Sequence, residues 1–271
     1  MIEKSGGYSG RLFSYHSVNV ILLEPDEVNH KGEVTLTGPR ARHVLDVLKA
    51  GPGQMVRVGM LNGSLGSAAV TASTDRGVSL RCTFTSERPS RSRVDLLLAL
   101  PRPKVLRRLW AQLAALGVGQ IILTNAERVE RNYFDTHVLG EACYRPLLIE
   151  GLQQARDTWL PRVSIHKQFR ILVEDDLTAL FPSGHRLVAH PGAVTTDMRL
   201  AGIGSSERVL LAVGPEGGWN AFELNLLRAH GFLAFDMGGR TLRTDTACIA
   251  LVALVHSALR ESERPSGSDS I

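Results

Sequence analysis

The stretch Leu211-Ala-Val-Gly-Pro-Glu-Gly-Gly-Trp219 joins a short apolar run to a loop with a proline and three glycines. An apolar run of this length, bounded by turn residues, is typical of a fully buried strand. Two further runs end in comparable loops, at Val188-Ala-His-Pro-Gly192 and Asp236-Met-Gly-Gly-Arg-Thr-Leu-Arg243. Ligands bind beyond the carboxyl ends of parallel strands, where glycines let the backbone approach them closely. The three loops therefore predict one binding site.

Strands and helices alternate on both sides of these loops, from residue 94 to residue 260. Such alternation predicts an α/β domain with a mainly parallel sheet. Asn220-Ala-Phe-Glu223 has the form of a capping box at a helix start. The expected strands cover 94–100, 118–123, 163–166, 186–190, 208–213 and 232–237, and the expected helices 105–116, 137–156, 220–231 and 244–260.

The first 88 residues have a different texture, with short β-like runs separated by glycine-containing turns. They predict a small β-barrel with a single helix over 40–50. Residues 87–93 are polar and contain a proline, as expected of a linker. The domain after it is expected to run from 94 to 262, and the Ser/Gly/Pro-rich residues 263–271 are expected to form a disordered tail. The expected strands are 18–23, 33–37, 55–60, 64–72 and 78–85.

Composition restricts the class of protein. Of 271 residues, 44% are hydrophobic and 21% charged, which is typical of a globular protein. The apolar stretch Ala247–Val255 is too short to cross a bilayer, and the first residues lack the order of a secretory signal. The three cysteines are isolated, so neither a disulfide framework nor a metal site is expected. A cytoplasmic protein without a membrane partner is predicted.

Positive charge is concentrated in one part of the chain. The net charge is only +4, but residues 88–131 contain nine basic and three acidic residues, and most of the basic residues are arginine. Arginine binds phosphate in a planar, bidentate fork, so this stretch suits a nucleic acid. A solvated surface that contacts no partner is an equally good interpretation of composition alone. The final helix, over 244–260, is apolar nearly all round, which favours a homodimer interface.

Two motifs together resemble a known family. Leu211-Ala-Val-Gly-Pro-Glu-Gly-Gly-Trp219, followed by Met237-Gly-Gly-Arg-Thr-Leu-Arg-Thr-Asp-Thr-Ala247, is similar to the paired C-terminal signature of the RsmE family. These SPOUT-superfamily methyltransferases act on N3 of a uridine in small-subunit (16S) ribosomal RNA. Weaker matches are Gly10-Arg-Leu-Phe13, His43-Val-Leu-Asp-Val-Leu48, Leu116-Gly-Val118 and Glu127-Arg-Val129.

The resemblance implies a PUA-like, RNA-binding barrel followed by a SPOUT domain with a C-terminal trefoil knot. It also implies a homodimer that uses S-adenosylmethionine as its cofactor and acts on ribosomal RNA or the small subunit during ribosome biogenesis. Glu216 is expected to hold its loop by accepting backbone N–H groups, and Trp219 to pack rather than to stack on a base. The expected cofactor-binding residues are Ala189, His190, Gly192, Val213, Gly214, Pro215, Glu216, Gly217, Gly218, Met237, Gly238, Leu242, Arg243, Thr246 and Ala247.

Methyl transfer to a uridine nitrogen requires loss of the N3 proton, and a nearby cation stabilises the anion that develops. Arg11 or Arg243 is the predicted catalytic cation. Two other functions stay open: a SPOUT methyltransferase with another RNA target, and a non-catalytic RNA-binding or ribosome-assembly protein of the same fold. The residues expected to contact RNA are Arg11, Arg40, Arg42, Arg88, Arg91, Arg93, Arg102 and Lys104.

Overall fold

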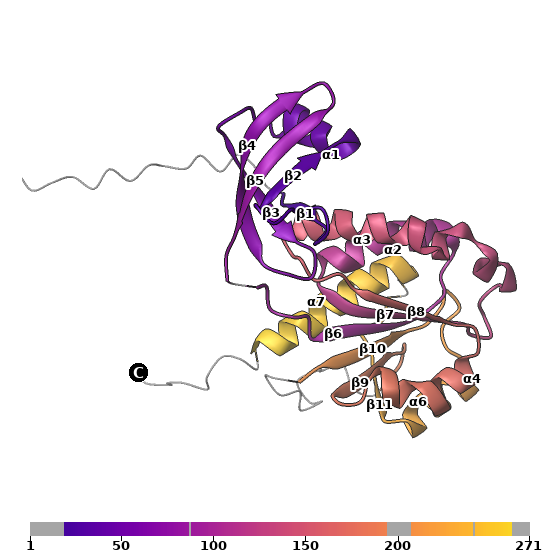
Figure 1. Cartoon of the computed structure of the whole chain (residues 1–271). Helices are drawn as coiled ribbons and strands as arrows, with labels where there is room; N and C mark the ends of the chain where they lie inside the picture. The colour runs from indigo at the N-terminus through magenta and orange to yellow at the C-terminus, as the bar shows by residue number, and fades with distance from the viewer. Residues whose placement is uncertain (1–18, 87, 194–206, 241, 262–271) are drawn as a thin grey trace, which may run out of the picture.

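The computed structural model describes residues 19–86, 88–193, 207–240 and 242–261, which form two sheets with separate cores (Figure 1). The N-terminal sheet has the strand order β1-β3-β4-β5-β2. Strands β1 and β3 pair in parallel, and the other neighbours are antiparallel. The strands are β1 (Ile21–Leu23), β2 (Glu33–Leu36), β3 (Met55–Met60), β4 (Leu65–Thr74) and β5 (Gly77–Phe84).

The helix predicted over 40–50 differs from the observed one in extent and type. Helix α1 (Gly38–Arg42) begins two residues earlier, because Pro39 suits the first turn of a helix. The chain then continues as a π-helical turn, η1 (His43–Val47), in which the Leu48 N–H donates to the His43 carbonyl at 3.0 Å. The predicted β-strands of this domain are all present, with ends shifted by up to three residues.

The C-terminal sheet has the order β11-β9-β10-β6-β7-β8, and every neighbouring pair is parallel. The predicted α/β class with a parallel sheet is therefore confirmed. Both central strands, β6 and β10, are buried at every position; β10 is apolar throughout, and β6 is apolar except for Asp95, which pairs with Arg208. The strands are β6 (Val94–Ala99), β7 (Val118–Thr124), β8 (Arg162–His166), β9 (His185–Ala189), β10 (Val209–Val213) and β11 (Phe232–Phe235).

Helices α2, α3 and α7 pack together beside the sheet (Figure 1). A Cβ at Gly151 of α3 would lie 2.0 Å from the Ala111 carbonyl oxygen of α2, so the glycine is what allows this close approach. The helix predicted over 137–156 is divided at Gly140. The helical segments are α2 (Pro103–Ala115), η2 (Arg131–Asp135), η3 (His137–Leu139), α3 (Glu141–Ala155), α4 (Phe169–Ile171), η4 (Leu172–Asp176), α5 (Leu177–Leu180), α6 (Ala221–Ala229) and α7 (Thr244–Glu261).

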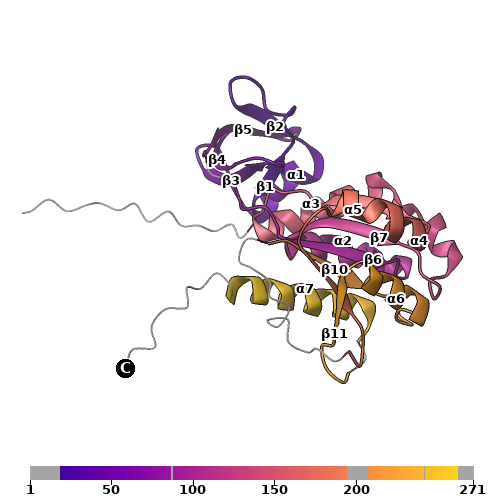
Figure 2. The same cartoon turned by 90° about the horizontal axis from the view of Figure 1, so that it is seen from below.

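The N-terminal sheet stands on the side of the C-terminal domain away from β11 (Figure 2). The segment between α3 and β8 joins the two domains. The Asn62 N–H donates to the Thr158 carbonyl at 2.7 Å, and the Thr158 hydroxyl donates to the Gly63 carbonyl at 2.7 Å. The indole N–H of Trp159 donates to the Pro89 carbonyl at 2.5 Å. Thr158 is fully buried, so these bonds are shielded from water and fix the two domains relative to each other.

Candidate functional site

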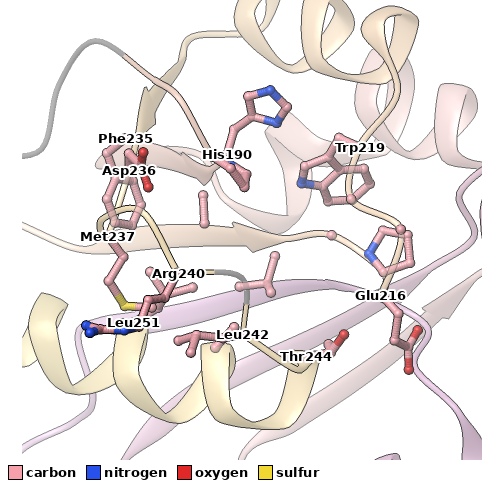
Figure 3. Close-up of a pocket in the computed structure, with 18 of the residues that line it drawn as sticks. His190, Glu216, Trp219, Phe235, Asp236, Met237, Arg240, Leu242, Thr244 and Leu251 are labelled. Carbon is pink, nitrogen blue, oxygen red and sulfur yellow. The ribbon is translucent and has the colours of Figure 1, made fainter.

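The three glycine-containing loops meet at the carboxyl ends of β9, β10 and β11 and enclose a cavity with the start of α7 (Figure 3). Its volume is about 280 Å³, close to the lower end of the roughly 300–1,000 Å³ typical of small-molecule sites. The residues that line it are Arg128, Ala189, His190, Pro191, Val213, Gly214, Pro215, Glu216, Gly217, Gly218, Trp219, Phe235, Asp236, Met237, Gly238, Arg240, Leu242, Thr244, Ala247 and Leu251.

The loop after β10 turns sharply and is held from outside by an arginine. The Gly218 N–H donates to the Pro215 carbonyl at 2.8 Å, and Gly218 has a φ of +72°, which favours glycine. A guanidinium N–H of Arg128, from the segment after β7, donates to the Gly217 carbonyl. A Cβ at Gly217 would lie 2.7 Å from Cδ of Arg128. Gly217, the first glycine of the pair Gly217-Gly218, therefore leaves the space in which Arg128 packs against the loop.

A buried carboxylate joins this loop to the same segment. Glu223, which is 3% exposed, accepts the Asn220 N–H at 2.8 Å and the Glu127 N–H at 2.7 Å. The Asn220 side chain in turn accepts the Glu223 N–H at 2.8 Å, which completes the predicted capping box of α6. We refer to these three bonds as the Glu223 clamp. It places Arg128 beside the cavity, because Arg128 follows Glu127 directly.

Asp236 organises the loop after β11. Its carboxylate accepts the Gly192 N–H at 2.8 Å and the Gly238 N–H at 3.0 Å, so it joins two of the three loops. These backbone N–H groups hold the pKa of Asp236 below its ordinary value. Gly238 has a φ of +117°, which an L side chain rarely adopts. The loop shape thus depends on a carboxylate and a glycine that lie two residues apart.

The cavity offers both apolar surface and polar atoms without partners. Figure 3 shows His190 and Trp219 on one side and Leu242 and Leu251 on the other. Within the described residues, Nδ1 of His190 and Nε1 of Trp219 are buried and have no hydrogen-bond partner. Buried polar atoms are normally paired, so these two are available to a bound molecule. The site therefore fits a ligand with an apolar part and several hydrogen-bonding groups.

Trp219 also packs, as predicted. It is 3% exposed, and its ring centroid lies 5.3 Å from that of Phe169. Glu216 was predicted to hold its own loop, but the backbone group that its carboxylate accepts is the Arg102 N–H, at 3.5 Å, from a different loop. Glu216 thus connects the cavity to the segment between β6 and α2.

The structure brings together all but three of the residues predicted to bind a cofactor. Gly192, Arg243 and Thr246 do not line the cavity: Gly192 supports it through Asp236, and Arg243 and Thr246 are exposed at the start of α7. Sequence analysis missed Arg128 and Asp236, and only Asp236 lies in a segment that the glycine pattern had singled out. The other lining residues outside the predicted set are Pro191, Trp219, Phe235, Arg240, Thr244 and Leu251.

The predicted RNA contacts lie in separate places. Arg40 forms an ion pair with Glu27, whereas Arg42 is exposed on α1. Arg91 lies in the linker together with Arg88 and Arg93, and its guanidinium stacks 4.4 Å from the ring centroid of Trp159. Arg102 and Lys104 are exposed beyond the opposite end of β6. Arg11 lies outside the described residues.

The described part of the chain contains neither a membrane-spanning helix nor a metal-binding cluster. No helix there is long and apolar enough to cross a membrane. No group of three or more His, Cys, Asp or Glu residues is arranged to hold a metal ion in the same residues.

Comparisons with known proteins give a consistent result. A family model described as an RNA methyltransferase domain matches residues 88–256. The chain is 32% identical over 255 residues to a protein of Treponema pallidum named ribosomal RNA small subunit methyltransferase E, covering 92% of this chain and 96% of that protein.

Two solved structures share the fold. One, from Legionella pneumophila, is described as a methyltransferase in complex with the bound cofactor SAM; it has a TM-score of 0.70 and 22% identity, and covers 88% of this chain and 98% of that chain. The other, a ribosomal RNA small subunit methyltransferase E from Neisseria gonorrhoeae bound to S-adenosylmethionine, has a TM-score of 0.68 and 22% identity, and covers 88% of this chain and 97% of that chain.

Proposed function

This chain belongs to the family of RNA methyltransferases that includes the ribosomal RNA small subunit methyltransferase E proteins, and we propose that it methylates N3 of a uridine in 16S ribosomal RNA with S-adenosylmethionine. The observation that carries this proposal is the cavity formed by three loops at the ends of β9, β10 and β11. A protein that only binds RNA has no need of such a cavity. We place the reaction in the cytoplasm, with ribosomal RNA or the small subunit as substrate.

The lining residues offer apolar and polar contacts, which suit different parts of the cofactor. Leu242, Leu251 and Met237 offer apolar contacts, and the partnerless nitrogens of His190 and Trp219 offer polar ones. Backbone groups of the glycine loops supply further hydrogen bonds, since no side chain shields them. When bound, S-adenosylmethionine supplies a methyl group on an electrophilic sulfonium. The protein needs no metal for such a transfer.

The uridine must lose its N3 proton, which leaves negative charge on the ring oxygens. A guanidinium near those oxygens stabilises that charge. We keep Arg11 and Arg243 as the proposed catalytic cations, and the structure adds Arg128, which lines the cavity. Arg240 also lines it, and we assign it to cofactor binding. Arg243 directly follows the lining residue Leu242, so it is close enough to reach a nucleotide at the mouth.

Arg243 and Arg240 allow a matched test of this assignment. Arg243→Ala is expected to lower kcat while the Kd for S-adenosylmethionine stays near that of the wild type. Arg240→Ala removes the same charge from the cavity wall and is expected to weaken cofactor binding. Equal loss of kcat and cofactor affinity in Arg243→Ala would contradict the catalytic assignment.

We further propose the knotted SPOUT topology, the PUA-like barrel and a homodimer. In support of a knot, the chain passes from the edge strand β11 back to α7, which contacts β6 and β10 in the middle of the sheet. In support of a dimer, α7 leaves Leu254, which follows the apolar run 249–253, 41% exposed. Leu254→Arg should yield a monomer by light scattering if α7 forms the interface.

The decisive experiment is transfer of labelled methyl from S-adenosylmethionine to unmodified small ribosomal subunits, followed by nucleoside analysis. N3-methyluridine would confirm reaction, cofactor and substrate together. Another methylated nucleoside would support the alternative of a methyltransferase with a different RNA target. Absence of both label and cofactor binding would favour a non-catalytic RNA-binding or assembly protein.

A further inference from the structure

A second cavity, of about 670 Å³, lies at the junction between the two domains. Three arginines line it and come from three separate segments: Arg57 from β3, Arg88 from the linker and Arg156 from the end of α3. The hydroxyl-bearing residues Ser67 and Thr85 also line it. None of its described lining residues is acidic, so the wall carries a formal charge of +3 from these side chains.

The backbone at Arg156 adds a second observation. Arg156 caps α3 in the left-handed conformation, with φ of 58° and ψ of 37°, and its N–H donates to the Leu152 carbonyl. Glycine is the usual residue at a helix end of this conformation, because a Cβ is unfavourable there. The position therefore holds a long cationic side chain in a backbone conformation that favours glycine.

The walls of this junction cavity are held in place by hydrogen bonds between domains. The linker wall is fixed by the bond from Trp159 to the Pro89 carbonyl, and the Val20 N–H donates to the Gln153 carbonyl at 3.1 Å. The hydrogen bond from the Asn62 N–H to the carbonyl of Thr158, the residue before Trp159, joins the same two domains. The backbone segments that carry the three arginines are thus held in place by the folded junction before any ligand arrives, which reduces the entropy lost on binding.

We propose that the junction cavity binds backbone phosphates of the RNA substrate. This inference rests on the proposed function, and it adds Arg57 and Arg156 to a site that includes one predicted RNA contact, Arg88. Guanidinium groups recognise phosphate through paired N–H donors, and neutral hydroxyls beside them can donate to the same oxygens. An RNA strand supplies several phosphates in a row, which matches a cavity whose cations come from three directions.

The position of this cavity sets what it does in the reaction. It lies beside Arg88 and Pro89 of the linker that leads into β6, whereas the methyltransferase cavity lies beyond the carboxyl ends of the strands. The six residues of β6 alone span roughly 20 Å between the linker side and the carboxyl-end side of the sheet. RNA held at the junction is too far from the reacting atoms to affect methyl transfer directly. The arginines are expected to influence KM and not kcat.

The test measures binding of a fluorescently labelled, unmodified 16S RNA transcript as a function of salt. Arg57→Ala, Arg88→Ala and Arg156→Gly are each expected to weaken binding at every salt concentration and to lower the slope of log K against log salt by about one. Glycine suits the left-handed backbone at Arg156, so Arg156→Gly should fold, and its Tm is measured beside its RNA binding to separate a binding defect from unfolding. Arg170→Ala removes one charge from α4 and is the control, expected to leave the slope unchanged.

Each outcome decides between the proposals. If the three variants bind RNA with the affinity and slope of the wild type while the wild type methylates subunits, the junction inference is wrong and the proposed function stands. If the variants bind naked RNA normally but lose affinity for assembled subunits, an acidic protein surface is the ligand and the RNA assignment is overturned. If the wild type neither binds the transcript nor methylates subunits, the proposed function itself fails. Raised KM with unchanged kcat in the variants supports the inference.

Discussion

Glu223→Gln is the substitution that most directly tests how the methyltransferase cavity is assembled. Glu223 is buried and accepts two backbone N–H groups, from Asn220 and Glu127, that belong to different segments of the chain. Glutamine has nearly the same shape but offers only one oxygen. Its amide nitrogen would face one of the two N–H donors, so that one bond is lost and one buried donor stays unsatisfied.

The expected size of the effect follows from these contacts. A hydrogen bond to a charged group contributes about 1.5–3 kcal/mol, and a buried unsatisfied donor costs about 1–3 kcal/mol. Since the two terms overlap, we expect Glu223→Gln to lower the free energy of unfolding by about 2–4 kcal/mol. The Glu223 clamp also positions the loop that carries Gly217 and Gly218. Cofactor affinity should therefore fall about tenfold, equivalent to about 1.4 kcal/mol.

Urea denaturation measures the first quantity, and calorimetric titration with S-adenosylmethionine measures the second. Asn220→Ser is the matched control, because serine also caps helices and should change stability by less than about 0.5 kcal/mol. A Glu223→Gln variant with wild-type stability and wild-type cofactor affinity would refute the reasoning. Loss of stability without loss of affinity would show that the clamp supports the fold and not the cavity.

Three further predictions concern other contacts. Gly151→Ala should destabilise the protein by about 3 kcal/mol in urea denaturation, because its Cβ meets the Ala111 carbonyl and neither helix can move freely. Gly217→Ala should weaken cofactor binding several-fold in the wild type but by less than about twofold in an Arg128→Ala background, because the clash is with Arg128; equal effects in both backgrounds would disprove the coupling. Burial lowers the pKa of His256 below its ordinary 6.5, so the unfolded chain takes up a proton first as the pH falls below 6.5. The free energy of unfolding should therefore decrease over that range, and His256→Gln should flatten this part of the pH profile.

Much of the fold could be predicted from local sequence, because apolar periodicity and turn residues act over a few neighbouring positions. The strands of the C-terminal sheet and the capping box at Asn220 were predicted in this way and are present. The errors lie where local signals conflict with packing. The segment after Arg42 continues the helical pattern but forms a π turn, and Gly140 divides what had the pattern of one long helix.

The candidate site was predicted in part, for a similar reason. Glycine loops at strand ends are visible in the sequence, and they line the observed cavity. Arg128 gave no such signal, because it lies 89 residues from the Gly217 carbonyl that it contacts. Nothing in a local pattern states which distant segment will lie beside a loop.

The sequence by itself determined the class of fold, the three loops and, through the paired C-terminal motifs, the family. Only the tertiary structure decided the strand order, which places β9 between β11 and β10 and so brings the loops of these three strands to one cavity. It also decided that Arg57, Arg88 and Arg156 share a cavity at the junction of the domains, although they come from three separate segments of the sequence. The physical reason is that propensity and periodicity act along the chain, whereas the order of strands is set by how whole elements bury their apolar faces against one another.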